Sequence, residues 1–278
     1  MSADSSLFFV GTATTLLRCG GFTVLTDPNF LHRGQRAYLG KGLWSTRLTE
    51  PALSPAELPA LDAVVLSHLH GDHWDRVARR GLDKSVPVIT TPEAARTLQS
   101  RQRFRRALGL AVWESHTIVR RDAERGGAGP SEWDGATLRV TALPGRHSPR
   151  PLTRLLPPVM GSLLEFADPS GEVLRRIYLS GDTLPFEGIP LIREHIGEVD
   201  RAVLHLGGTT LPGGLVVTMD GRMGADVLET IAPRRATPVH FDDYGVFRSP
   251  LSDFLAEVER RGWDDRVDVV DRGGTIPL

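Results

Sequence analysis

The sequence predicts an α+β protein in which β-sheets are layered and flanked by helices. Three observations support this fold class. Short apolar runs of strand length recur along the chain, and each ends in a polar or glycine-rich turn. Helical patterns lie between some of these runs, but helices and strands do not alternate strictly. A doubly wound parallel sheet requires that alternation, so layered sheets fit the pattern better.

Eight runs have the length and composition of β-strands. They are rich in β-branched and large apolar side chains, which pack well on a pleated surface. In chain order the runs are 8–10, 22–26, 63–67, 137–141, 162–166, 176–180, 202–206 and 236–240.

Helical periodicity and turn-rich stretches define the remaining elements. In chain order the expected helices span about residues 92–107, 224–231 and 252–261. Asp220 and Ser252 lie where helix N-caps are expected. Residues 126–130 form a turn cluster, and the proline-rich stretch Pro149–Pro158 is expected to be an ordered surface loop or flap. No linker composition marks a boundary, so we expect a single domain over residues 1–278.

Charge and cysteine content argue against several classes of protein. The 33 Lys and Arg residues nearly balance the 34 Asp and Glu residues, and the net charge of −1 creates no global field that favours nucleic acid. The basic stretch Arg101–Arg106 fits a solvated helix face. Cys19 is the only cysteine, so no intramolecular disulfide can form. Without a signal-peptide pattern or an apolar run of bilayer length, the expectation is a cytoplasmic protein with no membrane span.

A cluster of histidines and one aspartate follows directly on the apolar run 63–67. His68, His70, Asp72 and His73 are spaced so that a strand-to-helix turn can bring their side chains to one point. Imidazole nitrogens together with a carboxylate suit zinc, iron or manganese better than calcium or magnesium. The cluster therefore predicts a metal site.

Three further residues stand at the ends of predicted strands. They are His147, Asp182 and His240. Polar side chains presented by turns at strand ends are where sites in layered folds usually lie. Taken singly, each also fits a structural histidine or ordinary turn chemistry. Together with the first cluster they supply five histidines and two aspartates, enough for two adjacent metal ions.

These motifs resemble those of the metallo-β-lactamase superfamily, whose hallmark His-x-His-x-Asp-His matches residues 68–73. The sequence is most similar to the branch that contains bacterial ascorbate-6-phosphate lactonase and the phospholipase D acting on N-acyl-phosphatidylethanolamine. The segments that carry the likeness are 10–14, 25–28, 66–75, 147 with the loop after it, 180–183, 218–220 and 238–241. The resemblance implies a four-layer αββα sandwich with the site at one edge of the two sheets.

The resemblance also implies a ligand set for two divalent metal ions. By matching position, His68, His70 and His147 would hold the first metal ion. Asp72, His73 and His240 would hold the second, and Asp182 would bridge the two. Zinc is the expected metal, with manganese and iron as alternatives.

The implied chemistry is hydrolysis. Metal ions about 3.5–4 Å apart lower the pKa of a shared water, which becomes a bridging hydroxide and the nucleophile. They also polarise a carbonyl or phosphoryl oxygen. We therefore expect a hydrolase that cleaves an ester-like bond, either a phosphodiester or a lactone. Its partner would be a small-molecule substrate, with or without a phosphate group.

Two other reaction classes stay open. One is an iron-dependent oxidoreductase of the same superfamily, although no fused flavodoxin-like domain is present and the complete second ligand set argues against a mononuclear iron enzyme. The other is a nucleic-acid phosphodiesterase, but 278 residues leave little room for the inserted domain of such nucleases. A net charge of −1 also gives weak affinity for a polyanion.

Several residues outside the ligand set have two interpretations. Asp27 and Asp62 could orient ligand histidines, or form an Asx turn and a strand-start cap respectively. Asp220 is expected to cap a helix rather than touch metal. His205 could contact substrate or be a hydrogen-bonded core residue.

Acidic and basic residues flank the expected ligands. Asp242, Asp243 and Tyr244 closely follow His240, and one of them could be the general acid that protonates a leaving group, or could orient the ligands. Arg146, Arg150 and Arg154 could recognise phosphate or carboxylate, or be solvated residues of the flap. The sequence indicates neither the substrate nor the oligomeric state.

Overall fold

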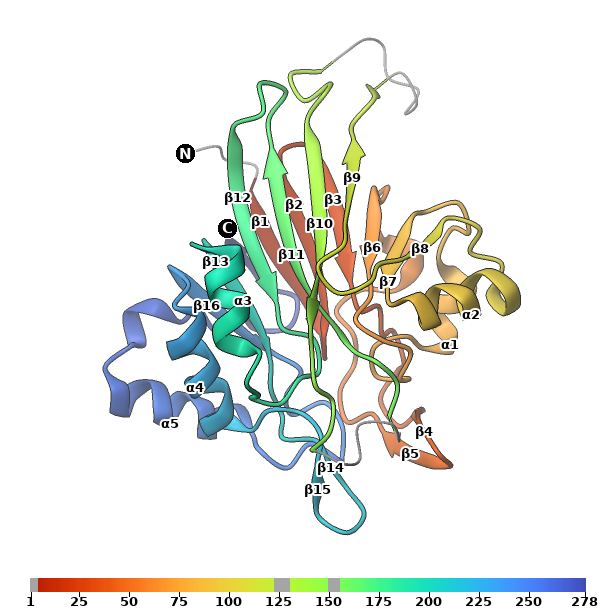
Figure 1. The fold of residues 1–278 in the computed structure, drawn as a ribbon. Coiled ribbons are helices and arrows are strands. Elements are labelled where there is room, and N and C mark those ends of the chain that lie inside the picture. The colour runs from red at the N-terminus through yellow and green to blue at the C-terminus, as the bar shows by residue number, and fades with distance from the viewer. Residues whose placement is uncertain (1–4, 123–130, 150–155) are drawn as a thin grey trace.

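Two β-sheets lie face to face in the computed structural model, which describes residues 5–122, 131–149 and 156–278 (Figure 1). The apolar space between them holds a core to which both sheets contribute, including Phe9 and Leu17 from one sheet and Val140 and Leu164 from the other. Helices cover the outer faces of both sheets, which gives the αββα sandwich of the metallo-β-lactamase fold.

The first sheet has seven strands in the order β17-β1-β2-β3-β6-β7-β8. Their bounds are Thr275–Pro277 (β17), Ser6–Gly11 (β1), Thr14–Cys19 (β2), Phe22–Thr26 (β3), Ala63–Val65 (β6), Val88–Thr90 (β7) and Ala107–Gly109 (β8). β1, β2 and β3 are antiparallel neighbours, whereas β3, β6, β7 and β8 run parallel.

The second sheet has six strands in the order β16-β13-β12-β11-β10-β9. Their bounds are Arg235–Val239 (β16), Arg201–His205 (β13), Val173–Leu179 (β12), Met160–Ala167 (β11), Thr137–Pro144 (β10) and Ser115–Val119 (β9). Successive side chains alternate between its faces, as the pleat requires. Ile177 points into the core between the sheets, and Tyr178 points to the helices outside.

Five α-helices and several short elements complete the described chain. The helices are Arg76–Gly81 (α1), Pro92–Gln102 (α2), Ile189–Ile196 (α3), Gly221–Ile231 (α4) and Leu251–Arg261 (α5). The short elements are the hairpins Arg36–Gly40 with Leu43–Thr46 (β4–β5) and Thr210–Leu211 with Leu215–Val216 (β14–β15), and the 3₁₀ turns Pro55–Glu57 and Asp264–Arg266. α1 and α2 pack on the first sheet, and α3, α4 and α5 pack on the second.

The strand directions decide where a site can form. β10, β12, β13 and β16 point the same way within the second sheet, and β3 and β6 are parallel within the first. Carboxyl ends of parallel strands meet at one edge of a sheet, so the loops after these strands lie together. This edge carries the polar residues described below.

All eight predicted strands are present, with ends shifted by a few residues, so these predictions are confirmed. The predicted helix 92–107 ends earlier, at Gln102, because Arg103 adopts a left-handed conformation (φ 66°) and the chain then enters β8. Asp220 is the N-cap of α4, as predicted.

The prediction of Ser252 as an N-cap was wrong. α5 already begins at Leu251, Pro250 stands at the N-cap, and Ser252 lies inside the first turn. Proline tolerates this position because the backbone N–H that it lacks needs no partner within the helix. The turn cluster at 126–130 and residues 150–155 of the proline-rich loop lie outside the described residues.

Candidate metal centre

The predicted ligands come from four loops at the shared edge of the two sheets. His68, His70, Asp72 and His73 lie between β6 and α1. The others each follow a strand of the second sheet: His147 follows β10, Asp182 follows β12 and His240 follows β16. The structure brings all seven side chains together in two groups of potential metal ligands.

The first group consists of three histidines. Nε2 of His68 lies 2.9 Å from Nδ1 of His70, and Nε2 of His147 lies 3.1 Å from the same Nδ1. His68 and His147 are buried, whereas His70 is partly exposed. Three nitrogens at such distances around one point have the spacing of ligands on one cation.

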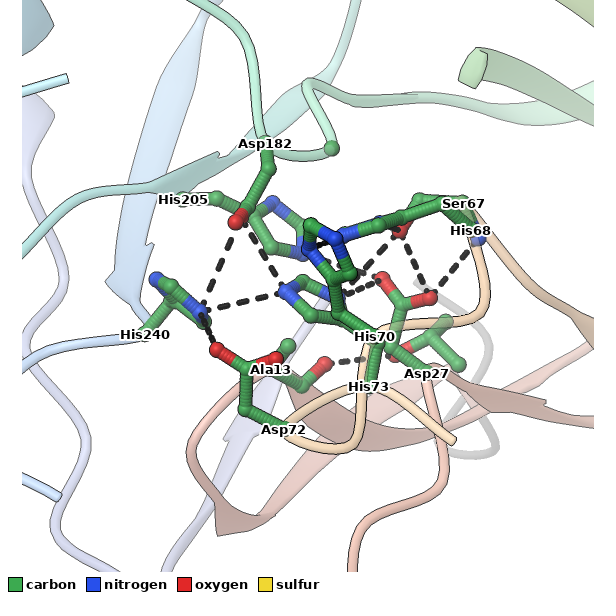
Figure 2. Close-up of polar contacts among 12 residues, drawn as sticks. Ala13, Asp27, Ser67, His68, His70, Asp72, His73, Asp182, His205 and His240 are labelled. Atoms are coloured by element: carbon green, nitrogen blue, oxygen red, sulfur yellow. Dashed lines mark hydrogen bonds and ion pairs between the residues drawn. The ribbon is translucent and has the colours of Figure 1, made fainter. Parts of the chain in front are cut away.

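The second group contains two histidines and two aspartates (Figure 2). Nε2 of His73 lies 3.1 Å from Nε2 of His240 and 3.2 Å from Oδ1 of Asp182. Nε2 of His240 lies 3.5 Å from Oδ2 of Asp72 and 3.6 Å from Oδ1 of Asp182. All four side chains are buried.

The second nitrogen of four of the histidines has its own partner. Nδ1 of His147 donates to the carbonyl of Val217 (2.9 Å), and Nδ1 of His240 donates to the carbonyl of Leu206 (3.0 Å). A carbonyl only accepts, so the proton sits on Nδ1 and leaves the lone pair of Nε2 free for a metal. Nδ1 of His68 contacts the Ser67 hydroxyl, and Nδ1 of His73 faces the Asp27 carboxylate.

The two groups differ in their electrostatics. Burial and the neighbouring histidine His147 lower the pKa of His70 to about 3, and burial also lowers the pKa of His68 and His147. Lowered pKa values favour the neutral form of these imidazoles, which is the form that binds metal. Burial opposes charge on His73 and His240 as well, but Asp182 and the other nearby carboxylates outweigh it and raise the pKa of both.

The residues present fit bound divalent cations. Zn–N bonds of about 2.0–2.1 Å in a tetrahedron place nitrogens about 3.3 Å apart, close to the separations observed. Within the described part of the chain, the buried Oδ1 atoms of Asp72 and Asp182 make no hydrogen bond. Buried carboxylate oxygens are costly without a partner, and a cation between the side chains would supply one.

Asp27 is not among the seven predicted ligands, but it forms an ion pair with one of them, His73, and hydrogen bonds with Ser67. Its Oδ1 accepts hydrogen bonds from the backbone N–H of Ser67 (2.7 Å) and from its hydroxyl (2.9 Å). Its Oδ2 faces His73 Nδ1 at 3.3 Å and His205 Nε2 at 3.2 Å. Burial alone would raise the pKa of the Asp27 carboxyl, but these two histidines hold it below its usual value. Asp27 thus orients a predicted ligand histidine, one of the two interpretations of the sequence.

His205 belongs to the same support. Its ring is buried, stacks on His73 with a centroid separation of 5.8 Å, and meets the Ser180 hydroxyl through Nδ1. It is a hydrogen-bonded core residue, the second interpretation of the sequence. Asp27, His73 and His205 form a third group of potential ligands, but their hydrogen bonds already account for their proximity.

Sequence reasoning missed two supporting hydroxyls. Ser67 lies between Asp27, His68 and His73, and Thr218 donates to Oδ2 of Asp182 at 3.0 Å. Both stand in segments that carry the family resemblance, which was the available signal. Asp62, in contrast, lies just before β6, at the end of that strand opposite to the ligands. It accepts the backbone N–H of Thr23 in β3 and is a strand-start cap.

The proposed proton donors are not brought into either ligand group. Asp242 is exposed, with a carboxylate oxygen 3.5 Å from the backbone nitrogen of Leu251. The carboxylate of Asp243 is buried and turned to Thr12, Thr49 and Arg272. A general acid must reach the leaving group, and neither aspartate is placed at the ligand atoms. The Tyr244 hydroxyl donates to Asn29.

The arginine-containing loop is described only in part. Arg146 pairs with Glu187 at 2.6 Å and lies over the ring of Phe186. Arg150 and Arg154 lie outside the described residues.

Replacing Asp220 by alanine is expected to lower stability and leave metal content unchanged. Its Oδ1 accepts the backbone N–H of Met223 (2.8 Å) and caps α4. Losing such a cap costs about 1 kcal/mol, which urea denaturation would measure. A large drop in metal content at an unchanged melting temperature would contradict this interpretation.

The chain is similar in sequence to known metal-dependent hydrolases. Residues 23–241 match a family model described as a β-lactamase superfamily domain. A UPF0173 metal-dependent hydrolase of Deinococcus radiodurans is 29% identical over 219 residues, which cover 78% of this chain and 80% of that protein. Another UPF0173 metal-dependent hydrolase, from Archaeoglobus fulgidus, is 25% identical over 269 residues and 95% of each chain.

Solved structures share the fold. A possible metal-dependent hydrolase from Veillonella parvula superposes with a TM-score of 0.79 at 22% identity, covering 99% of this chain and 100% of that one. An isothiocyanate hydrolase from Delia radicum gut bacteria gives 0.77 at 20% identity, covering 98% and 99%. CmlA, a diiron β-hydroxylase from Streptomyces venezuelae, gives 0.64 at 16% identity, and the match covers all of this chain but 55% of CmlA.

Among the described residues, no helix is long and apolar enough to cross a bilayer.

Proposed function

The chain belongs to the metallo-β-lactamase superfamily, and from this premise we propose that it is a metal-dependent hydrolase with a binuclear centre. The observation that carries the proposal is the convergence of seven side chains in two adjacent ligand groups. The relatives from Deinococcus radiodurans and Archaeoglobus fulgidus are both described as metal-dependent hydrolases.

The proposed division of the ligands follows the family resemblance. His68, His70 and His147 would hold one ion, and Asp72, His73 and His240 would hold the other. Oδ1 of Asp182 faces His73 and His240 within the second group. Its proposed bridging position rests on the family resemblance. Nitrogen and carboxylate donors suit zinc, with manganese and iron as alternatives.

When bound, two such ions would supply a deprotonated water near neutral pH and polarise the oxygen of the scissile group. The chain itself holds the ligand side chains in fixed orientations. Hydrogen bonds to Nδ1 fix the rings of His147 and His240, and Asp27 fixes His73. Burial keeps the polar groups of the second group out of water. Electrostatic interactions between them are stronger in the protein interior than in water.

The substrate would approach from the side of His70, the partly exposed member of the ligand set. The tip of the β4–β5 hairpin flanks this side. A Cβ built at Gly40 would lie 3.6 Å from Nε2 of His70. This proposed substrate is a small molecule with a phosphodiester or lactone bond, as the resemblance to the lactonase and phospholipase branch suggests.

The test is to load the purified protein with Zn²⁺ or Mn²⁺, count the metal, and assay a generic phosphodiester and a generic lactone. Bis(p-nitrophenyl) phosphate and dihydrocoumarin are suitable probes. We expect two metal ions per chain and turnover of one substrate class that chelation abolishes. Failure to cleave either class after full loading would contradict the proposal. Iron in the protein together with oxygen uptake would instead favour the oxidoreductase alternative, whose fold is also represented among the structural neighbours.

A further inference from the structure

One buried carboxylate next to the metal centre is not a potential ligand. Asp243 follows His240 by three residues, its side chain is fully buried, and neither of its oxygens belongs to a ligand group. Oδ2 accepts the backbone N–H of Thr12 at 2.8 Å, across 231 residues of sequence. Oδ1 accepts from the Thr49 hydroxyl and, at 2.6 Å, from Nη2 of Arg272. The carboxylate therefore joins three distant segments.

Thr12 connects this carboxylate to a predicted ligand. Its carbonyl accepts the backbone N–H of His240 at 2.6 Å, while its own N–H donates to Asp243. The backbone of Thr12 is thus held at one atom by the ligand residue and at another by Asp243. A shift of Asp243 would be transmitted to His240 through this single residue.

The backbone at both ends of this link adopts an uncommon conformation. Thr12 has φ 55°, and His240 and Asp242 have φ 63° and 57°. Left-handed φ is unfavourable for residues with a side chain, and most of all for a β-branched residue such as threonine. Such conformations persist only where the surroundings over-determine them. Here the hydrogen bonds between Asp243, Thr12 and His240 provide that constraint.

We infer that Asp243, paired with Arg272, is a positioning residue that holds His240 in place through Thr12. The inference rests on the proposed function, because it matters only if His240 binds a metal ion. His240 is then fixed at two points: its backbone N–H donates to the Thr12 carbonyl, and its ring Nδ1 donates to the Leu206 carbonyl. Without the first point, His240 loses its alignment with Asp72 in the second ligand group, whereas the three-histidine group is unaffected.

The test compares two isosteric variants by metal titration. In Asp243→Asn, one amide oxygen replaces two acceptors, so the side chain cannot serve both Thr12 and Arg272. Asp268→Asn is the matched control. Asp268 also accepts from an arginine, here the buried Arg201 (2.7 Å). It pairs as well with Arg235 at the first residue of β16, at the opposite end of that strand from His240.

Wild type and Asp268→Asn are expected to bind two Co²⁺ or Zn²⁺ ions per chain. Asp243→Asn is expected to keep one tight ion and to bind the second about 10–100 times more weakly, the usual effect of losing a residue that orients a ligand. The visible spectrum of bound Co²⁺ reports the loss of one site without any assay of activity. Equal affinities for both ions in Asp243→Asn and Asp268→Asn would overturn the inference.

If Asp243→Asn does not fold, variants of its ion-pair partner Arg272 provide the test. Arg272→Met is expected to weaken the second ion, and Arg272→Lys, which keeps the charge, is expected to restore much of its affinity. Two tight ions in Arg272→Met would overturn the inference. Absence of metal binding by the wild type would overturn the proposed function and this inference with it, whereas two tight ions in every variant would overturn the inference alone.

Discussion

Replacing Asp182 by alanine is expected to remove tight binding of at least one metal ion and to lower kcat/KM for hydrolysis by a factor of about 1,000 or more. Oδ1 of Asp182 is buried, lies 3.2 Å from His73 and 3.6 Å from His240, and has no hydrogen bond within the described chain. Burial opposes ionisation of this carboxyl, but His240 and His73 hold its pKa well below the usual value. Its removal would take a buried negative charge away from His73 and His240.

Metal content and steady-state rates of the Zn²⁺-loaded variant check this expectation. Asp62→Ala is a suitable control because Asp62 also lies at the end of a strand, but it accepts the backbone N–H of Thr23 at the opposite end of the first sheet from the ligands. It should retain both ions and the wild-type rate. Two ions and an undiminished rate in Asp182→Ala would show that Asp182 is not a ligand.

Replacing Gly71 by alanine is expected to lower the affinity for both metal ions by about 10–100-fold and the free energy of unfolding by about 1–3 kcal/mol. A Cβ at Gly71 would lie 2.7 Å from the backbone nitrogen and 2.8 Å from the carbonyl oxygen of Tyr38. Both atoms belong to the backbone of β4, which also accepts the Gly71 N–H at 2.8 Å. The loop that carries His70 and Asp72 must therefore move away.

Calorimetric metal titration and urea denaturation test this prediction together. Gly245→Ala is the matched control, because a Cβ at Gly245 meets no atom within 4 Å and its φ is not in the left-handed region. That variant should bind metal as the wild type does. Wild-type metal affinity in Gly71→Ala would mean that the hairpin yields to the extra methyl group and does not restrain the ligand loop.

The local part of the site could be predicted from the sequence alone. Strand-length runs of apolar residues predicted where β6, β12 and β16 lie, and donors of the right chemistry stood at their ends. The run from His68 to His73 predicted a metal site because its residue types and spacing suffice within one turn. The family resemblance then implied two ligand sets bridged by Asp182, and the structure places the same seven side chains in two groups, with Asp182 beside Asp72, His73 and His240.

The helices were predicted less completely. α1 and α3 are short, and their positions depend on packing against a sheet that the sequence does not display. Ser252 looked like an N-cap by residue type, yet the helix begins one residue before it.

The sequence by itself determined the candidate donor residues and the strands that present them. Only the tertiary structure decided which of several similar aspartates serves the site. Asp27 and Asp62 both flank strands of the first sheet, but they lie at opposite ends of parallel neighbours, and one alone reaches His73. Asp243 was a candidate acid by its distance from His240 along the chain, and the fold turns its carboxylate toward Thr12 and Arg272 instead. Such choices depend on contacts between residues far apart in the sequence and on burial, and neither is encoded in local spacing.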